Sequence, residues 1–204
     1  MTPLLFLLLA CRPDPGAPDY PTREPFSVPG DNFYDLPLAD GEERLSLGIF
    51  YEGEATETVV IDDTTAHFYI YENTFSDQVS DDRYEGFVAD LLTHGSLAWW
   101  GGGVTWDSPR DLSGWEALHL VVKTWDLADW DIGVNGGGVE VRRPVSDYGL
   151  VADGAWHVIE VPLEDFDGAD LAAVTVPLLM VGESGSAGDS LLLDAVFYTR
   201  GGGS

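Results

Sequence analysis

The sequence is short of lysine and of cysteine, and these shortages narrow its chemistry. Lys123 is the only lysine among nine basic residues, whereas 36 residues are acidic and the formal net charge is -27. A surface this negative repels phosphate backbones, which argues against nucleic-acid binding. Cys11 is the only cysteine and has no intramolecular disulfide partner. The four histidines show no i, i+4 pair, so a zinc site is not expected either.

The acidic residues are dispersed among apolar runs and do not form a single block. The simplest interpretation is a highly soluble, solvated surface. A salt-adapted surface and oxygen ligands for a hard cation such as calcium are the alternatives.

Long hydrophobic runs are also missing. The apolar stretch Leu4–Ala10 is far shorter than the roughly 20 residues of a membrane-spanning helix, so it reads as an export signal. Its end, Leu8-Leu9-Ala10-Cys11, resembles a bacterial lipobox, although no basic residue precedes the run. We therefore expect a lipoprotein-type signal peptide at residues 1–10, lipidation of Cys11, and a membrane-anchored protein of the bacterial envelope, in the periplasm or at the cell surface. An ordinary cleaved signal and a free buried thiol are the alternatives.

Residues 11–44 are rich in proline, which opposes helix and favours extended segments. This composition predicts a semi-rigid tether or a disordered leader with no chemistry of its own. Residues 200–204 read as a flexible glycine-rich tail. One domain is expected between them, at residues 45–199, since its hydrophobic content suffices for a core.

Within this domain, short β-branched and aromatic runs alternate with turn residues, which predicts an all-β sandwich or barrel. On the run Leu118–Thr124, His119 and Lys123 are expected on the face opposite Leu118, Leu120 and Val122. Residues 84–92 fit a short helix or a strand equally well. The expected strands are 45–51, 58–61, 67–71, 118–124, 131–135, 139–143, 156–161, 174–181 and 191–198.

Four phrases of the domain, in order along the chain, resemble jelly-roll, galactose-binding-like carbohydrate-binding modules. Phe68–Asn73 is similar to an opening strand that ends in an acidic residue, and Asp111–Leu118 to a turn that enters a strand. Asp153–Phe166 resembles a strand followed by Pro-Leu-x-Asp-Phe, and Leu193–Phe197 resembles the closing strand. Such domains also occur at the C-terminus of some bacterial exo-acting glucan hydrolases. The resemblance implies a single β-sandwich jelly roll that binds a polysaccharide or glycan.

The resemblance also implies a structural calcium ion near the first and last strands. Carried over to this chain, its ligands are Asp194, Glu72 and Glu85, although Asn73 stands where the family often has an acid. An edge-strand carboxylate in water is the alternative for Asp194. Trp115 and Trp156 stand at strand entrances, where we expect them to have structural roles.

The other tryptophans are candidates for stacking on sugar rings, because flat indoles suit the C–H faces of pyranoses. If residues 99–100 are extended, only one of Trp99 and Trp100 can face a ligand, and the other belongs in the core. Hydrogen bonds to sugar hydroxyls are expected from His119, Asn135 and Arg142. The stacking candidates are Trp99, Trp100, Trp106, Trp125, Trp130 and Tyr148.

No catalytic motif emerges from the residues. With 36 acidic residues, some carboxylate pair will match glycosidase spacing by chance, so abundance removes that signal. Residues 182–186 lack the second glycine of a nucleophile elbow. We therefore expect non-catalytic glycan binding. A structural or protein–protein interaction module of the envelope and, after it, a small glycan-active enzyme are the alternatives.

Overall fold

The computed structural model describes residues 41–47, 58–61, 64–84 and 88–201. The signal peptide, Cys11, nearly all of the expected tether and Glu85 lie outside the described residues, and so does most of the glycine-rich tail. No helix in the described part of the chain is long and apolar enough to cross a membrane.

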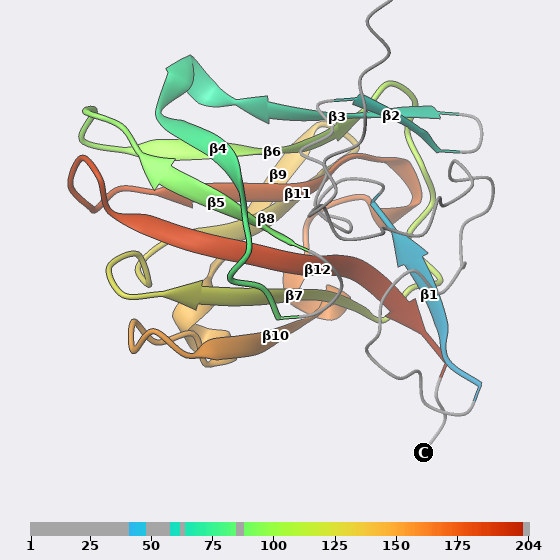
Figure 1. Ribbon diagram of the computed structural model, residues 1–204. Coiled ribbons are helices and arrows are strands. Elements are labelled where there is room, and N and C mark those ends of the chain that lie inside the picture. The colour runs from blue at the N-terminus through green and yellow to red at the C-terminus, as the bar shows by residue number, and fades with distance from the viewer. Residues whose placement is uncertain (1–40, 48–57, 62–63, 85–87, 202–204) are drawn as a thin grey trace, which may run out of the picture.

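Two antiparallel sheets face one another and form a β-sandwich (Figure 1). Sheet A has the strand order β10-β7-β12-β5-β4, with β1 paired to β12, and sheet B has the order β2-β3-β6-β11-β8-β9. The strands of sheet A are β1 (Glu43–Ser46), β4 (Phe75–Ser80), β5 (Ala89–His94), β7 (Ala117–Thr124), β10 (Trp156–Pro162) and β12 (Ser190–Arg200). Those of sheet B are β2 (Thr58–Ile61), β3 (Thr64–Ile70), β6 (Trp100–Trp106), β8 (Asp131–Gly136), β9 (Val139–Pro144) and β11 (Val174–Gly182). Short 3-10 turns are η1 (Tyr71–Asn73), η2 (Val145–Tyr148), η3 (Leu163–Phe166) and η4 (Leu171–Ala173).

The core lies between the sheets and is filled by alternate residues of the strands. On β7, Leu118, Leu120 and Val122 are buried in this core, whereas His119 and Lys123 point to the other face of sheet A. Side chains alternate across a strand, so this pattern is the period-two arrangement expected from the sequence. The all-β sandwich predicted from the sequence is confirmed.

A bulge interrupts β12 near its middle. Ala195 has φ of 49°, and the pairing with β7 shifts between Asp194 and Phe197. The shift changes which positions face inward, so Leu193 before it and Val196 after it both enter the core. Asp194 is buried, and its carboxylate accepts hydrogen bonds from the backbone N–H groups of Tyr84 and Ala195 at 2.9 and 2.8 Å.

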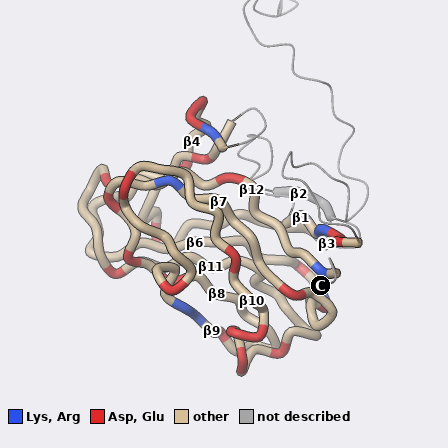
Figure 2. The backbone as a smooth tube through the Cα atoms, turned by 90° about the horizontal axis from the view of Figure 1, so that it is seen from below, with Lys and Arg blue, Asp and Glu red and all other residues tan. Residues whose placement is uncertain are grey.

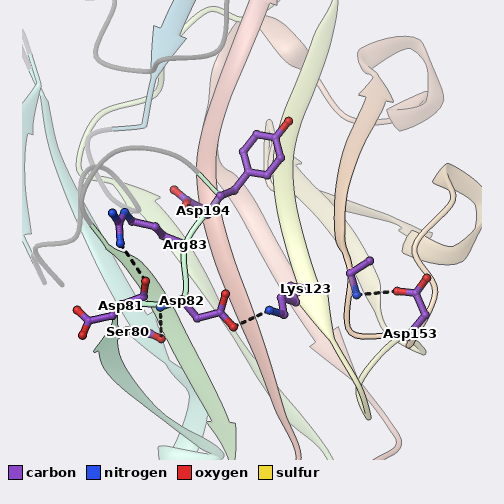
Figure 3. A network of polar contacts seen from close by, with 9 residues as sticks. Ser80, Asp81, Asp82, Arg83, Lys123, Asp153 and Asp194 are labelled. Atoms are coloured by element: carbon purple, nitrogen blue, oxygen red, sulfur yellow. Dashed lines mark hydrogen bonds and ion pairs between the residues drawn. The ribbon is translucent and has the colours of Figure 1, made fainter.

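The segment after β4 crosses the outer face of sheet A (Figure 3). Asp82 receives a hydrogen bond from Lys123 Nζ of β7 at 2.6 Å, and the Tyr84 ring meets the Trp156 ring of β10 edge to face at 6.1 Å. Trp156 in turn packs against a small outer cluster of Val121, Ala195 and Phe197. This position agrees with the structural role expected for Trp156. Trp115 packs against the main core, which agrees with the structural role expected for it.

Of the two options for residues 84–92, the strand holds for the described residues 89–92. The chain forms strand β5 from Ala89, and β5 pairs with β4 on one side and β12 on the other. Two hydrogen-bonded ladders outweigh the weak helical propensity of so short a segment. Strands β4 and β6 were not among the expected strands, because β4 is polar and β6 is mostly glycine in its middle.

Acidic residues are spread over turns and strands around the molecule, with only a few basic residues between them (Figure 2). The single lysine is ion-paired with Asp82. This distribution agrees with a solvated acidic surface and not with one charged patch.

Candidate functional site

The outer face of sheet B has a floor made by glycines. Trp100, Val104 and Trp106 of β6 enter the core, so the alternate residues Gly101 and Gly103 face outward. A Cβ atom at Gly101 would lie 3.1 Å from Tyr71 Cδ2 and 3.5 Å from Trp99 Cζ3. The two aromatic rings therefore lie close over a strand that has no side chain beneath them.

Three aromatic rings follow one another along this face. The Tyr69 and Tyr71 ring centroids are 5.0 Å apart with the planes at 67°, and the Tyr71 and Trp99 centroids are 6.2 Å apart at 44°. Tyr71 is exposed, while Tyr69 and Trp99 are half-buried. We call Tyr69, Tyr71 and Trp99 the aromatic face.

A charged pair borders the aromatic face on β9. Arg142 holds Glu140 Oε1 through both Nε and Nη2, each at 2.5 Å. Arg142 pairs with Gly133 of β8, and Gly133 pairs with Leu179 of β11. Leu179 pairs in turn with Gly103 of β6, and Gly103 with Tyr69 of β3. The row of paired residues thus carries an aromatic ring at one end and a guanidinium at the other.

The hydroxyl groups of the aromatic face are hydrogen-bonded to each other. The Tyr69 and Tyr71 oxygens are 3.3 Å apart. Burial raises the pKa of the Tyr69 phenol, and the hydrogen bond with Tyr71 raises it further. Both effects keep Tyr69 protonated and neutral at physiological pH, so it can donate a hydrogen bond.

A shallow pocket of about 340 Å³ opens beside these rings, a volume at the low end of the range for small-molecule sites. It is lined by Tyr71, Trp99, Arg142, Val181 and Glu183. Two aromatic rings and an aliphatic side chain supply apolar contact area, and a guanidinium and a carboxylate supply a donor and an acceptor at its border. This combination suits a ligand that has both apolar C–H surfaces and hydroxyl groups.

Three predicted ligand-binding residues lie on this face of sheet B. Trp99 and Arg142 line the pocket. Asn135 of β8 is half-buried and stands opposite Glu140 of β9. Its Oδ1 atom is buried without a hydrogen-bond partner.

The expectation that Trp100, Trp106 and Trp130 stack on a ligand is wrong, because all three belong to the core and are no more than 3% exposed. Trp100 and Trp106 occupy inward positions of β6, and Trp130 packs on Trp100 with ring centroids 5.9 Å apart. An indole closed off in this way has no free face. As expected from strand alternation, Trp99 and Trp100 divide between the surface and the core.

The other predicted ligand-binding residues do not join the aromatic face. His119 lies on sheet A, stacked on Phe197 at 5.0 Å with Nε2 2.8 Å from Thr199 Oγ1, and burial lowers its pKa. Tyr148 donates a hydrogen bond to Asp165. Burial, and to a smaller extent this hydrogen bond, raises the pKa of Tyr148 to about 12. Trp125 follows β7 and is exposed at the end of sheet A.

The expected calcium ligands do not assemble among the described residues. Glu72 is exposed on the turn η1, Asp194 is buried and bonded to backbone N–H groups, and Glu85 is outside the described residues. In the described part of the chain, no group of three His, Cys, Asp or Glu side chains could hold a metal ion. Because Glu85 lies outside the described residues, calcium binding by Asp194, Glu72 and Glu85 stays a prediction.

Sequence reasoning missed Tyr69, Tyr71, Glu140 and Glu183. The signal for the two tyrosines was present, because residues two apart on a strand share a face. Taken alone, that spacing indicates only a strand. Nothing in the local sequence marks Glu140 or Glu183, since acidic residues are abundant everywhere in the chain.

No protein-family model and no curated protein sequence matches the chain. Among solved structures, similarity extends to the family 30 carbohydrate-binding module of a cellulosomal cellulase of Clostridium thermocellum. The TM-score is 0.50 with 20% identity, over 72% of this chain and 88% of that one. A family 11 module from the same organism, solved with a β-1,3-1,4-mixed-linked tetrasaccharide, has a TM-score of 0.48 and 16% identity over 78% and 95% of the two chains.

A third match is the exo-1,3/1,4-β-glucanase of a Pseudoalteromonas species, with a TM-score of 0.45 and 15% identity. It covers 72% of this chain but only 17% of the enzyme. Identities at this level bear on the fold and not on the ligand. The described domain is a jelly-roll β-sandwich, and its structural neighbours include carbohydrate-binding modules.

Proposed function

We propose that the domain binds a polysaccharide or oligosaccharide without catalysis, through the aromatic face of sheet B. The observation that carries this proposal is the pocket in which the Tyr71 and Trp99 rings meet Arg142 and Glu183. The fold shared with carbohydrate-binding modules supports it.

The chemistry of the face suits a pyranose. Its C–H groups can rest on the negative π faces of Tyr71 and Trp99, whose rings lose little rotamer freedom on binding. Its hydroxyl groups can receive hydrogen bonds from Arg142 and donate them to Glu140 or Glu183. The three rings are tilted relative to one another by 67° and 44°, so they offer separate contacts along a curved ligand and not one flat plate.

Replacing Tyr71 or Trp99 with alanine is expected to weaken glycan binding about tenfold each, equivalent to about 1.4 kcal/mol. Each change removes one ring from the pocket. Affinity electrophoresis with soluble mixed-linkage β-glucan, xylan and galactan identifies a ligand, and calorimetry with the matching oligosaccharide measures the affinity.

The matched control is Tyr84→Ala. Tyr84 is 40% exposed and Tyr71 is 37% exposed, but Tyr84 lies on the outer face of sheet A. We expect the control to bind like the unchanged protein. Equal affinity in all three variants would contradict a role of the aromatic face in binding. If the unchanged protein binds no glycan of the panel, a protein partner is favoured. Release of reducing sugar would contradict a non-catalytic role.

We further propose that the protein is exported and anchored through a lipid on Cys11. The support is the sequence Leu8-Leu9-Ala10-Cys11 at the end of a short apolar run. Cys11→Ser is expected to abolish incorporation of radiolabelled palmitate and to move the protein out of the bacterial membrane fraction. Unchanged labelling in this variant would refute lipidation at Cys11.

A further inference from the structure

Trp125 is the most exposed large apolar side chain of the described residues, with 67% of its surface in contact with solvent. It follows the last residue of β7, in the connection to β8. An indole so exposed contributes little to the core, and its apolar area in water is unfavourable. Its exposed face is therefore available to a ligand.

One face of the Trp125 ring is already supported by the protein. A Cβ atom at Gly154 would collide with Cζ2, Cε2 and Cη2 of the indole, so the benzene half of the ring lies directly on the Gly154 backbone. Gly154 also has φ of 72°, in the left-handed region that favours glycine. Only glycine at this position leaves room for the ring.

The segments on both sides of this contact are held by hydrogen bonds. Gly154 N donates to Thr124 O at 2.8 Å. The Thr124 hydroxyl accepts from Asp126 N and Leu127 N at 3.1 and 2.8 Å and donates to Ser190 O at 2.8 Å. The indole thus extends from the ordered turn after Thr124 onto the ordered turn at Gly154. Because both turns are already held in place, the protein loses less conformational entropy when a ligand contacts the ring.

Exposed hydrogen-bond acceptors stand next to Trp125 and Gly154 in the sequence. Asp126 and Asp153, the sequence neighbours of Trp125 and Gly154, are exposed. The Asp153 carboxylate accepts a hydrogen bond from Ala155 N at 2.8 Å and lies 2.9 Å from His157 Nε2. The contact with His157, and after it the one with Ala155, lowers the pKa of Asp153. Asp153 is therefore an ionised acceptor at neutral pH.

We propose that Trp125, supported by Gly154 and with the exposed residues Asp126 and Asp153 adjacent in the sequence, is a second contact for an uncharged pyranose. A flat exposed ring suits the C–H face of a neutral sugar, and exposed carboxylates on the same two turns suit its hydroxyl groups. The same carboxylates repel phosphate groups and uronates. Trp125 belongs to the end of sheet A and the aromatic face to sheet B, so the two contacts are separate.

The ligand class of this proposal rests on the proposed function, but its location does not. Two weak contacts in one domain engage one insoluble polysaccharide surface together, and the second contact then acts at a high effective concentration. The second contact is therefore expected to affect retention on an insoluble polysaccharide more than affinity for a short oligosaccharide.

The test uses the ¹⁵N-labelled full chain and its indole N–H signals, with those of Trp99 and Trp125 identified through Trp99→Phe and Trp125→Phe. The probes are cellohexaose and laminarihexaose as neutral sugars and hexagalacturonate as their anionic counterpart. We expect a neutral sugar to shift the Trp125 signal saturably, in the intact chain and equally in Tyr71→Ala, and hexagalacturonate to leave it unchanged. Trp125→Ala is expected to lower retention on an insoluble β-glucan at least about threefold.

The outcomes separate the two proposals. A saturable shift at Trp99 with none at Trp125 would overturn the second contact and leave the proposed function intact. A shift at Trp125 alone would support the second contact and contradict the aromatic face. If hexagalacturonate shifts Trp125 as strongly as the neutral sugars, the assignment to an uncharged pyranose is wrong.

Discussion

Replacing Trp100 with alanine is expected to lower the free energy of unfolding by about 3–5 kcal/mol. The Trp100 side chain is among the largest that are fully buried, and it packs against Phe75 and Trp130 with ring centroids 6.0 and 5.9 Å away. Removing it leaves a cavity between the two sheets that the surrounding strands can only partly close. Guanidinium unfolding followed by far-ultraviolet circular dichroism measures the loss.

Trp125→Ala is the matched control, because it removes the same side chain from an exposed site. Its unfolding free energy is expected to change by less than about 1 kcal/mol. Similar losses in the two variants would contradict the assignment of one indole to the core and the other to the surface.

Replacing Asp90 with asparagine is expected to stabilise the domain at pH 8.5 by an amount on the order of a few kcal/mol. Asp90 is buried on β5, and Asp77 is a diagonal neighbour on β4, since Asp90 pairs with Val79 and Asp77 with Leu92. Burial raises the pKa of Asp90 to about 8, with smaller contributions from Asp77 and Asp194. Burial likewise raises the pKa of Asp77 to about 6.

The direction of the pH dependence follows from these shifts. Above the ordinary aspartate pKa of 3.8, the unfolded chain releases the Asp90 proton while the folded chain still holds it. The contribution of Asp90 to stability is therefore intact below about pH 4, decreases as the pH rises, and levels off above about pH 8. Asparagine cannot ionise, so Asp90→Asn should gain most at high pH and little at pH 4 to 5.

Unfolding curves of the unchanged protein and the variant at pH 4.5 and pH 8.5 measure this difference. Asp129→Asn serves as the control because Asp129 is exposed. A gain for Asp90→Asn that is the same at both pH values would contradict a buried carboxyl with a raised pKa.

The sandwich was predictable because its information is local. Alternation on β7 and the turn residues before β7 and β10 specify strands and their ends without reference to distant contacts. Strands β4 and β5 were harder to predict. Their polar or ambiguous segments become strands through pairing with each other and with β12, more than 90 residues later in the chain.

The candidate site was only partly predictable for a related reason. Local sequence marked Trp99 as a residue of the surface or the core but could not decide which, because the parity of β6 is fixed by its pairing with β3 and β11. The meeting of Tyr71 from the end of β3, Trp99 before β6 and Arg142 from β9 depends on sheet order, which short-range patterns do not encode. The same pairing placed Trp106 and Trp130 in the core, although their spacing had suggested exposed rings.

A crystal structure of the chain with the oligosaccharide that binds most tightly in the affinity panel is the most direct test. The account predicts a sugar ring against Tyr71 and Trp99, with a hydroxyl group within hydrogen-bond distance of Arg142 or Glu183. A bound oligosaccharide that leaves this pocket of sheet B empty would contradict it.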